Sequence, residues 1–284
     1  MTRIIGPPCM DAFPWPQTDT NKHTRGRLAV FSGDGLQTGA ARLAANCGAR
    51  IGAGWVKIFA PSRAAQIIAT HISAIMVAAY EHGEELPAEI SGYNALVVGP
   101  GFGIAAPQQA TLTALMGQSI GLVLDADALI MLGFDAKRAF EIIKSRKAVT
   151  ILTPHSGEFS RLFSMKVSKS IETRIEETVY GAKKSGAIVV HKGAQTIIAT
   201  PNEEVWILDK SSPFLASAGT GDCLAGFIGG LLAQGCVPID ACKMAVYLHA
   251  EIGKFIGAGL LADDIGPNIG NVLDNFAPDN LKRH

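Results

Sequence analysis

Short apolar segments alternate with helix-length amphipathic segments along most of this chain, and that alternation limits the possible folds more than any other feature. Helical periodicity between successive buried strands is typical of a mostly parallel sheet that helices cover on both faces. The sequence therefore predicts an α/β fold with three layers: helices, sheet, helices.

The apolar segments give the expected strands. They span residues 28–31, 55–59, 95–98, 121–124, 149–152 and 187–190, followed by a hairpin of 196–199 with 205–208. Pro201 and Asn202 favour a turn at the tip of this hairpin. Expected helices span 108–116, 136–145, 171–185 and 224–232, and a further helix begins near Thr38, which we expect to be its N-cap.

Composition favours one large domain. Apolar residues make up 48% of the chain and charged residues 18%, which supports a large buried core and excludes a disordered chain. Residues 1–26 are rich in proline and are expected to form an irregular arm or linker. No repeat or break in composition divides residues 27–284, which we expect to form a single domain.

The charge balance and the terminal sequence exclude several classes of partner. Lys plus Arg equals Asp plus Glu, 25 of each, so no overall field attracts nucleic acid or a membrane surface. The start of the chain lacks the apolar segment of a signal peptide. Five cysteines without C-x-x-C spacing indicate core residues in a reducing compartment. We therefore expect a cytoplasmic protein.

Residues 218–222, Ala-Gly-Thr-Gly-Asp, stand directly before the expected helix 224–232. Glycines at a helix start let main-chain N–H groups converge on an anion, and the helix dipole adds positive potential. Asp222 would then lie where a carboxylate can take a proton from a hydroxyl that attacks phosphorus. A glycine turn with Asp222 as an ordinary N-cap explains the motif equally well. Both interpretations remain open on this motif alone.

A second junction follows the strand at 149–152 and contains His155 and Glu158, one helical turn apart. Both side chains can face a ligand, with Glu158 reaching Mg²⁺ through water. The same spacing fits a capping box, which is the stronger interpretation of this motif by itself.

Three further junctions contain candidate residues, whereas His249 is not a candidate for the site. Glycines at 99–103 permit close approach to a ligand, although their spacing does not match a dinucleotide fingerprint. Asp125 and Asp127 end a buried strand and suggest metal or hydroxyl binding, though Asp127 is better explained as a cap. Lys192 can neutralise phosphate or stay a solvated turn residue. His249 shares an apolar helix face and is expected to be a satisfied core residue.

Six motifs in this order resemble one family. They are residues 39–45 leading to 50–54, then 99–103, 125–129, 153–158, 192–194 and 219–222. Together they resemble the NAD(P)H-hydrate dehydratases, which have a ribokinase-like fold, over residues 21–275. The sequence departs from the family at three places: Ser217-Ala218 stands where Thr-Gly is more usual, Trp55 stands where leucine is common, and the arm lacks the usual histidine before Lys22 and aromatic residue after it. None of these removes a proposed reacting group.

The resemblance implies specific roles. Asp222 would be the catalytic residue. The hydrated nicotinamide nucleotide would contact Ala40, Gly103, His155 and Asp222. The adenine nucleotide would contact Lys192, Gly193, Ala194, Gln195, Thr196 and Gly221. Glu158 would lie near Mg²⁺. The co-substrate would be ADP, as in bacterial members, or ATP, as in eukaryotic ones.

The implied reaction is dehydration of hydrated NADH or NADPH through phosphorylation of the ring hydroxyl and loss of phosphate. A small-molecule kinase of the same fold, of the hydroxymethylpyrimidine or thiazole type, is the first alternative. A non-catalytic nucleotide-binding regulator is the second. The Pro-rich start resembles the linker after an epimerase domain, so pairing with an NAD(P)H-hydrate epimerase is expected, and the apolar helices allow a homo-oligomer.

Overall fold

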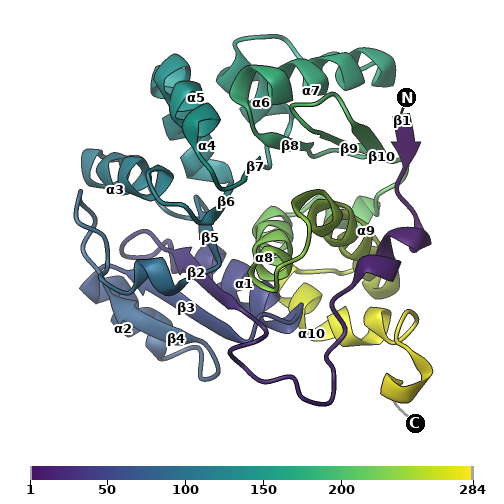
Figure 1. Cartoon of the computed structure of the whole chain (residues 1–284), viewed down its shortest axis with the longest axis horizontal. Coiled ribbons are helices and arrows are strands. Elements are labelled where there is room, and N and C mark those ends of the chain that lie inside the picture. The colour runs from purple at the N-terminus through teal and green to yellow at the C-terminus, as the bar shows by residue number, and fades with distance from the viewer. Residues whose placement is uncertain (1, 283–284) are drawn as a thin grey trace.

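A computed structural model describes residues 2–282, which contain one ten-stranded sheet (Figure 1). Its strands in spatial order are β1 (Thr2–Ile4), β10 (Val205–Leu208), β9 (Thr196–Ala199), β8 (Ile188–His191), β7 (Thr150–Leu152), β6 (Gly121–Leu124), β5 (Ala95–Val98), β2 (Arg27–Phe31), β3 (Trp55–Ala60) and β4 (Met76–Ala79). Every neighbouring pair is parallel except β8 with β9 and β9 with β10. The predicted mostly parallel sheet is confirmed.

Helices cover both faces of this sheet (Figure 1). One face packs against α1 (Thr38–Arg50), α2 (Ser62–Ala69), α8 (Thr220–Ala233), α9 (Pro238–Ile256) and α10 (Ala262–Leu273). The other packs against α3 (Ala106–Met116), α4 (Ala126–Leu132), α5 (Ala136–Ser145), α6 (Ser156–Phe163) and α7 (Ile171–Ser185). This is the predicted three-layer arrangement. No helix within residues 2–282 combines the length and the apolar character needed to cross a membrane.

Some elements differ from the sequence prediction. The arm is partly regular, because Thr2–Ile4 pairs with β10 and Pro7–Ala12 forms a 3₁₀ helix. The exposed side chains of β1 carry no apolar pattern, so only main-chain pairing reveals this strand. The edge strand β4 was also not predicted. Gln37, not Thr38, is the N-cap of α1, and its side chain makes no capping hydrogen bond.

The chain changes direction in the sheet between β2 and β5. From β2 it continues outward to β3 and β4, whereas from β5 it continues the other way through β6, β7 and β8. Ligands in open α/β sheets bind outside the carboxyl ends of the strands at such a switch point. Here the loops after β2 and β5 meet, since the main-chain N–H of Gly33 donates to the carbonyl oxygen of Gly101 at 3.0 Å.

Helices α1 and α8 approach each other closely enough that only glycine fits at the crossing. A Cβ atom on Gly226 would lie 2.1 Å from the carbonyl oxygen of Ala44. One on Gly230 would lie 2.6 Å from the carbonyl oxygen of Gly48. Main-chain atoms cannot yield as a flexible side chain does. The position of α8, which begins at the predicted anion-binding turn, is therefore fixed by its contact with α1.

This contact predicts the effect of one methyl group. Gly226→Ala should lower the free energy of unfolding by about 1–3 kcal/mol, the usual cost of overpacking a core. Gly133 is the matched control, because it has a helical backbone and nothing within 4 Å of an added Cβ. Gly133→Ala should change stability by less than about 1 kcal/mol, in the stabilising direction. Chemical denaturation measures both, and equal effects would contradict the packing argument.

Candidate active site

Most of the candidate residues lie on the loops that follow β5, β6, β7 and β8 or on the first turn of α8, whereas Ala40 lies in α1. These four strands are consecutive in the sheet and parallel, so their carboxyl ends share one edge. The loop after β7 joins the loop after β8 directly. His155 and Lys192 form a parallel β-bridge, and the main-chain N–H of Lys192 donates to the carbonyl oxygen of Pro154 at 2.8 Å.

The turn before α8 has the geometry that its glycines allow. Gly219 is the N-cap with φ of 91°, and an added Cβ would lie 2.7 Å from Ala262 and 2.8 Å from Leu43. The Thr220 hydroxyl lies 2.8 Å from the carbonyl oxygen of Leu215 and 3.0 Å from that of Ser217. No side chain caps this helix. Its first N–H groups are therefore left to bind an external anion.

Asp222 is the third residue of α8. It is not the N-cap, so the capping interpretation of this residue is wrong. Its pKa is raised from 3.8 to about 7, chiefly by burial and also by the nearby Asp125 carboxylate, while Lys192 opposes the shift. A carboxylate with a pKa near neutrality can accept a proton at physiological pH and release it again.

A buried ion pair stands beside this carboxylate. The Lys192 Nζ lies 2.6 Å from Asp125 Oδ1 and 4.0 Å from Glu158 Oε2, and the Lys192 side chain is 18% exposed. Burial opposes its charged form, but the carboxylates of Asp125 and Glu158 outweigh burial and raise the pKa of Lys192. A Cβ on Gly221 would lie 3.2 Å from this ammonium group. Lys192 thus carries a fixed positive charge next to the anion-binding turn.

The backbone between Asp125 and Asp127 is strained. Ala126 has φ of 43°, a left-handed conformation that costs a residue with a side chain about 1–3 kcal/mol. The two carboxylates on either side of Ala126 have different partners. Asp125 binds Lys192, whereas Asp127 Oδ2 accepts from the main-chain N–H of Gly103 at 2.8 Å. The expectation that Asp127 caps a turn is therefore wrong.

The first turn of α6 is the capping box that the sequence favoured. His155 Nδ1 accepts from the N–H of Gly157 at 2.9 Å, and Glu158 Oε2 accepts from the N–H of His155 at 2.7 Å. The imidazole is 56% exposed and remains available to a ligand. Glu158 is buried, which raises its pKa, while Lys192 opposes the rise.

Magnesium fits this donor set only together with a phosphate ligand. Among residues 2–282 no three His, Cys, Asp or Glu side chains converge on one point as metal ligands. Mg²⁺ commonly binds proteins through one or two carboxylates plus substrate phosphates and water. Glu158, whose second oxygen lies 3.5 Å from the exposed His155 ring, is compatible with such a water-mediated contact.

The glycine loop after β5 contacts the start of α1. A Cβ on Gly101 would lie 2.4 Å from the carbonyl oxygen of Gln37 and 3.3 Å from the Ala40 Cβ. Ala40, an expected substrate contact, therefore lies against the loop that also carries Gly103. Asp127, Ala126 and Asp125 link this loop to the ion pair of Lys192.

The loop after β8 is held by hydrogen bonds to the segment that follows β10 and by a bond within the loop. Gly193 and Ala194 are exposed, and the carbonyl oxygen of Ala194 accepts from the N–H of Ser211 at 2.9 Å. The Gln195 amide donates to Asp209 at 2.8 Å. Thr196 is 6% exposed and donates its hydroxyl to the carbonyl oxygen of Gly193, so its side chain supports the loop from within.

Sequence reasoning gave two residues too little weight. Asp125 was noted only as half of an acidic pair, and nothing local reveals its bond to Lys192, 67 residues away. His191 was not noted because it ends an apolar strand.

His249 is buried as expected, and burial lowers its pKa to about 4, but among the described residues its Nε2 has no hydrogen-bond partner. The prediction that it is satisfied is therefore only half right.

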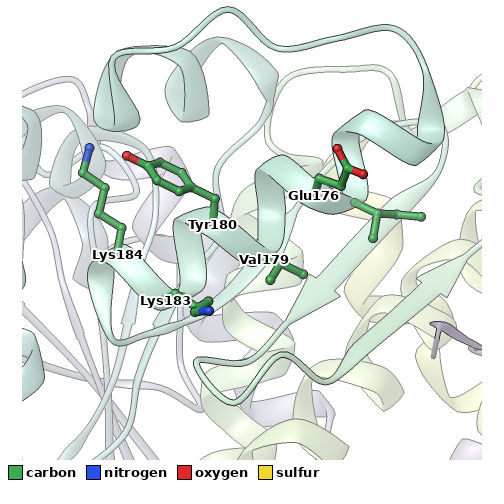
Figure 2. A pocket seen from close by; sticks show the side chains of 6 residues that line it. Glu176, Val179, Tyr180, Lys183 and Lys184 are labelled. Atoms are coloured by element: carbon green, nitrogen blue, oxygen red, sulfur yellow. The ribbon is translucent and has the colours of Figure 1, made fainter.

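A separate hollow is lined by residues of α7. Its volume is about 650 Å³, and it is lined by Ile175, Glu176, Val179, Tyr180, Lys183 and Lys184 (Figure 2). None of these residues belongs to the group around Asp222 and Lys192. The chemistry described above therefore lies elsewhere, at the carboxyl edge of the sheet.

Comparison with known proteins gives a consistent family. The family model described as NAD(P)H-hydrate dehydratase matches residues 28–263. The ADP-dependent (S)-NAD(P)H-hydrate dehydratase of Xanthomonas campestris is 30% identical over 290 residues, covering 96% of this chain and 97% of that protein.

Longer relatives and a solved structure agree. The bifunctional NAD(P)H-hydrate repair enzyme of Gloeobacter violaceus is 36% identical over 84% of this chain, which spans only 46% of that protein. The ADP/ATP-dependent NAD(P)H-hydrate dehydratase of Bacillus subtilis, co-crystallised with ATP and Mg²⁺, superposes with a TM-score of 0.82 at 28% identity. The alignment covers 95% of this chain and 96% of that one.

The electrostatics of the site predict a titration shift. Asp125→Asn should lower the pKa of Asp222 below about 7, because it removes a neighbouring negative charge and the nearest ion-pair partner of Lys192. NMR titration of ¹³C-labelled aspartate carboxyls measures this pKa. Asp19→Asn, an exposed substitution in the arm, should leave it unchanged. An unchanged or higher Asp222 pKa in Asp125→Asn would contradict the assigned coupling.

Proposed function

The chain belongs to the NAD(P)H-hydrate dehydratase family, and from this premise we propose that it uses an adenine nucleotide to dehydrate the S-epimer of hydrated NADH or NADPH. The enzyme is a lyase that restores the intact cofactor. One observation carries the mechanism: the Asp222 carboxylate, with a pKa of about 7, stands at the open start of a 14-residue helix beside the Lys192 ammonium group.

We propose roles for the loop residues on the same grounds. The hydrated nicotinamide nucleotide contacts Ala40, Gly103, His155 and Asp222. The adenine nucleotide contacts Lys192, Gly193, Ala194, Gln195, Thr196 and Gly221. The exposure of Gly193 and Ala194 and the proximity of Gly221 to Lys192 support this division. For Thr196, whose side chain is turned inward, the contact is through the main chain.

The reaction proceeds in two steps. Asp222 accepts the proton of the ring hydroxyl while that oxygen attacks the terminal phosphorus of the nucleotide, and the bond from phosphorus to the bridging oxygen breaks. The N–H groups at the start of α8 and the Lys192 ammonium group stabilise the developing negative charge. The lone pair of the ring nitrogen then expels phosphate, and loss of a proton from the neighbouring ring carbon restores the double bond.

We propose that Glu158 holds Mg²⁺ through water when the nucleotide is bound. The ion would neutralise charge on the phosphoryl oxygens.

We further propose ADP as the natural phosphoryl donor, because the Xanthomonas and Bacillus relatives are named for ADP or ADP/ATP dependence. Residues 27–284 form the catalytic domain in this proposal. Partnership with an NAD(P)H-hydrate epimerase follows from the bifunctional relatives, of which this chain spans about half.

Product analysis tests the function. With hydrated NADPH, Mg²⁺ and ADP, near-ultraviolet absorbance should return, with one phosphate and one AMP released per cofactor restored. Asp222→Asn should lower the rate by about 10²–10⁴, the usual contribution of a general base, while still binding ADP. Asp240→Asn alters the equivalent third residue of α9 and should leave the rate unchanged. A stable phosphate ester without recovered absorbance would instead indicate a kinase.

The raised pKa predicts opposite pH dependences for activity and stability. The value of kcat/KM should rise with pH and level off above about 7, as Asp222 of the free enzyme loses its proton. The pKa of Asp222 is higher in the folded protein than its ordinary value of 3.8 in the unfolded chain. Above pH 3.8, ionisation of Asp222 therefore destabilises the folded state. Asp222→Asn should therefore be more stable than wild type at pH 8, by a margin that shrinks towards pH 4. Denaturation at both pH values checks this, and a margin independent of pH would contradict it.

A further inference from the structure

His191 is the last residue of β8 and directly precedes Lys192. Its imidazole is fully buried and lies parallel to the Phe159 ring of α6, with ring centroids 4.4 Å apart and an interplanar angle of 4°. Burial lowers its pKa to about 3, and the positive charge of Arg174 acts in the same direction. The ring is therefore neutral, with one N–H group and one bare nitrogen.

The hydrogen bonds around His191 fix which nitrogen carries the proton. The Thr178 hydroxyl of α7 donates to the carbonyl oxygen of Arg174 at 2.7 Å, so its single proton is used. Thr178 Oγ1 can then only accept from His191 Nδ1, which lies 3.0 Å away. The bare Nε2 must accept from the Ser156 hydroxyl of α6 at 3.2 Å. One chain of three hydrogen bonds thus connects α7, β8 and α6.

We propose that His191 is a positioning residue that ties the hydrate-binding start of α6 to the nucleotide-binding loop after β8. Ser156 follows His155, and Lys192 follows His191, so the single bond between Ser156 and His191 joins both sites at adjacent residues. The main chain supports the same junction through the His155–Lys192 bridge. This inference rests on the proposed function for the identity of the two ligands.

Helix α7 contacts the same loop at a second point. Arg174 Nη1 donates to the carbonyl oxygen of Gln195 at 3.3 Å, and a Cβ on Gly193 would lie 2.9 Å from Arg174 Nη2. Since Arg174 also receives the Thr178 hydrogen bond, one turn of α7 supports the loop at both ends. His191 is the part of this support that extends to the hydrate side.

Steady-state kinetics and nucleotide binding test the inference. His191→Leu and Ser156→Ala should each raise the KM for the hydrate and the Kd for ADP by about 3- to 10-fold, the size of one net hydrogen bond, with a smaller change in kcat because Asp222 lies on another element. The double variant should be no weaker than His191→Leu alone. Ser160→Ala, on the same helix with no hydrogen bond from its hydroxyl in the described structure, should leave all constants unchanged.

Conservative replacements give a second readout. The amide of Gln reaches the position of Nε2 and that of Asn the position of Nδ1. His191→Gln should therefore restore most of the lost affinity by accepting from Ser156, whereas His191→Asn should not. If His191→Leu fails to fold, Ser156→Ala and Thr178→Val test the proposal instead, because both keep the imidazole. The KM for the hydrate and the Kd for ADP are then measured in these two variants.

The outcomes separate a positioning role from simple packing. Unchanged KM and Kd, with kcat falling only in proportion to lost folded protein, would overturn the proposal. So would additive effects of Ser156→Ala and His191→Leu. Calorimetry measures ADP binding without turnover. If the wild-type protein binds ADP but restores no cofactor, the proposed reaction is refuted. The ADP affinities of the variants still test the role of His191.

Discussion

The buried ion pair between Lys192 and Asp125 joins the ends of β8 and β6 and stands against the first turn of α8. Removing Lys192 would leave the buried Asp125 carboxylate without its counter-charge, and breaking a buried pair typically costs about 3–5 kcal/mol. The pair also sets the local potential, because Lys192 lowers and Asp125 raises the pKa of Asp222. Phosphate attraction and proton transfer thus depend on the same two side chains.

The site gives up stability in several places for this chemistry. Asp222 is desolvated without a capping role, Ala126 has a left-handed backbone, and the N–H groups at the start of α8 have no side-chain partner. Rigid surroundings make these features possible. The glycine contact of α8 with α1 fixes the helix, and hydrogen bonds from α7 fix the loop after β8.

Much of this architecture is readable from local sequence. Six buried strands, the hairpin of β9 with β10 and the glycine turn at the start of α8 were predicted because each depends on periodicity or on glycine conformation within a few residues. The strands β1 and β4 were not predicted, since an edge strand is held by main-chain pairing and needs no apolar pattern. The capping box of His155 and Glu158, which the motif by itself favoured, is confirmed by the structure.

The sequence by itself determined the α/β alternation, the order of the loop motifs and the residue types available for catalysis, because these follow from short-range rules. Only the tertiary structure decided which of those residues meet. Lys192 with Asp125, Asp127 with Gly103 and His191 with Thr178 are pairs brought together by parallel strands and crossing helices. Their charges and hydrogen bonds act over a few ångströms in space, and the number of residues between two side chains does not determine how far apart they lie in the fold.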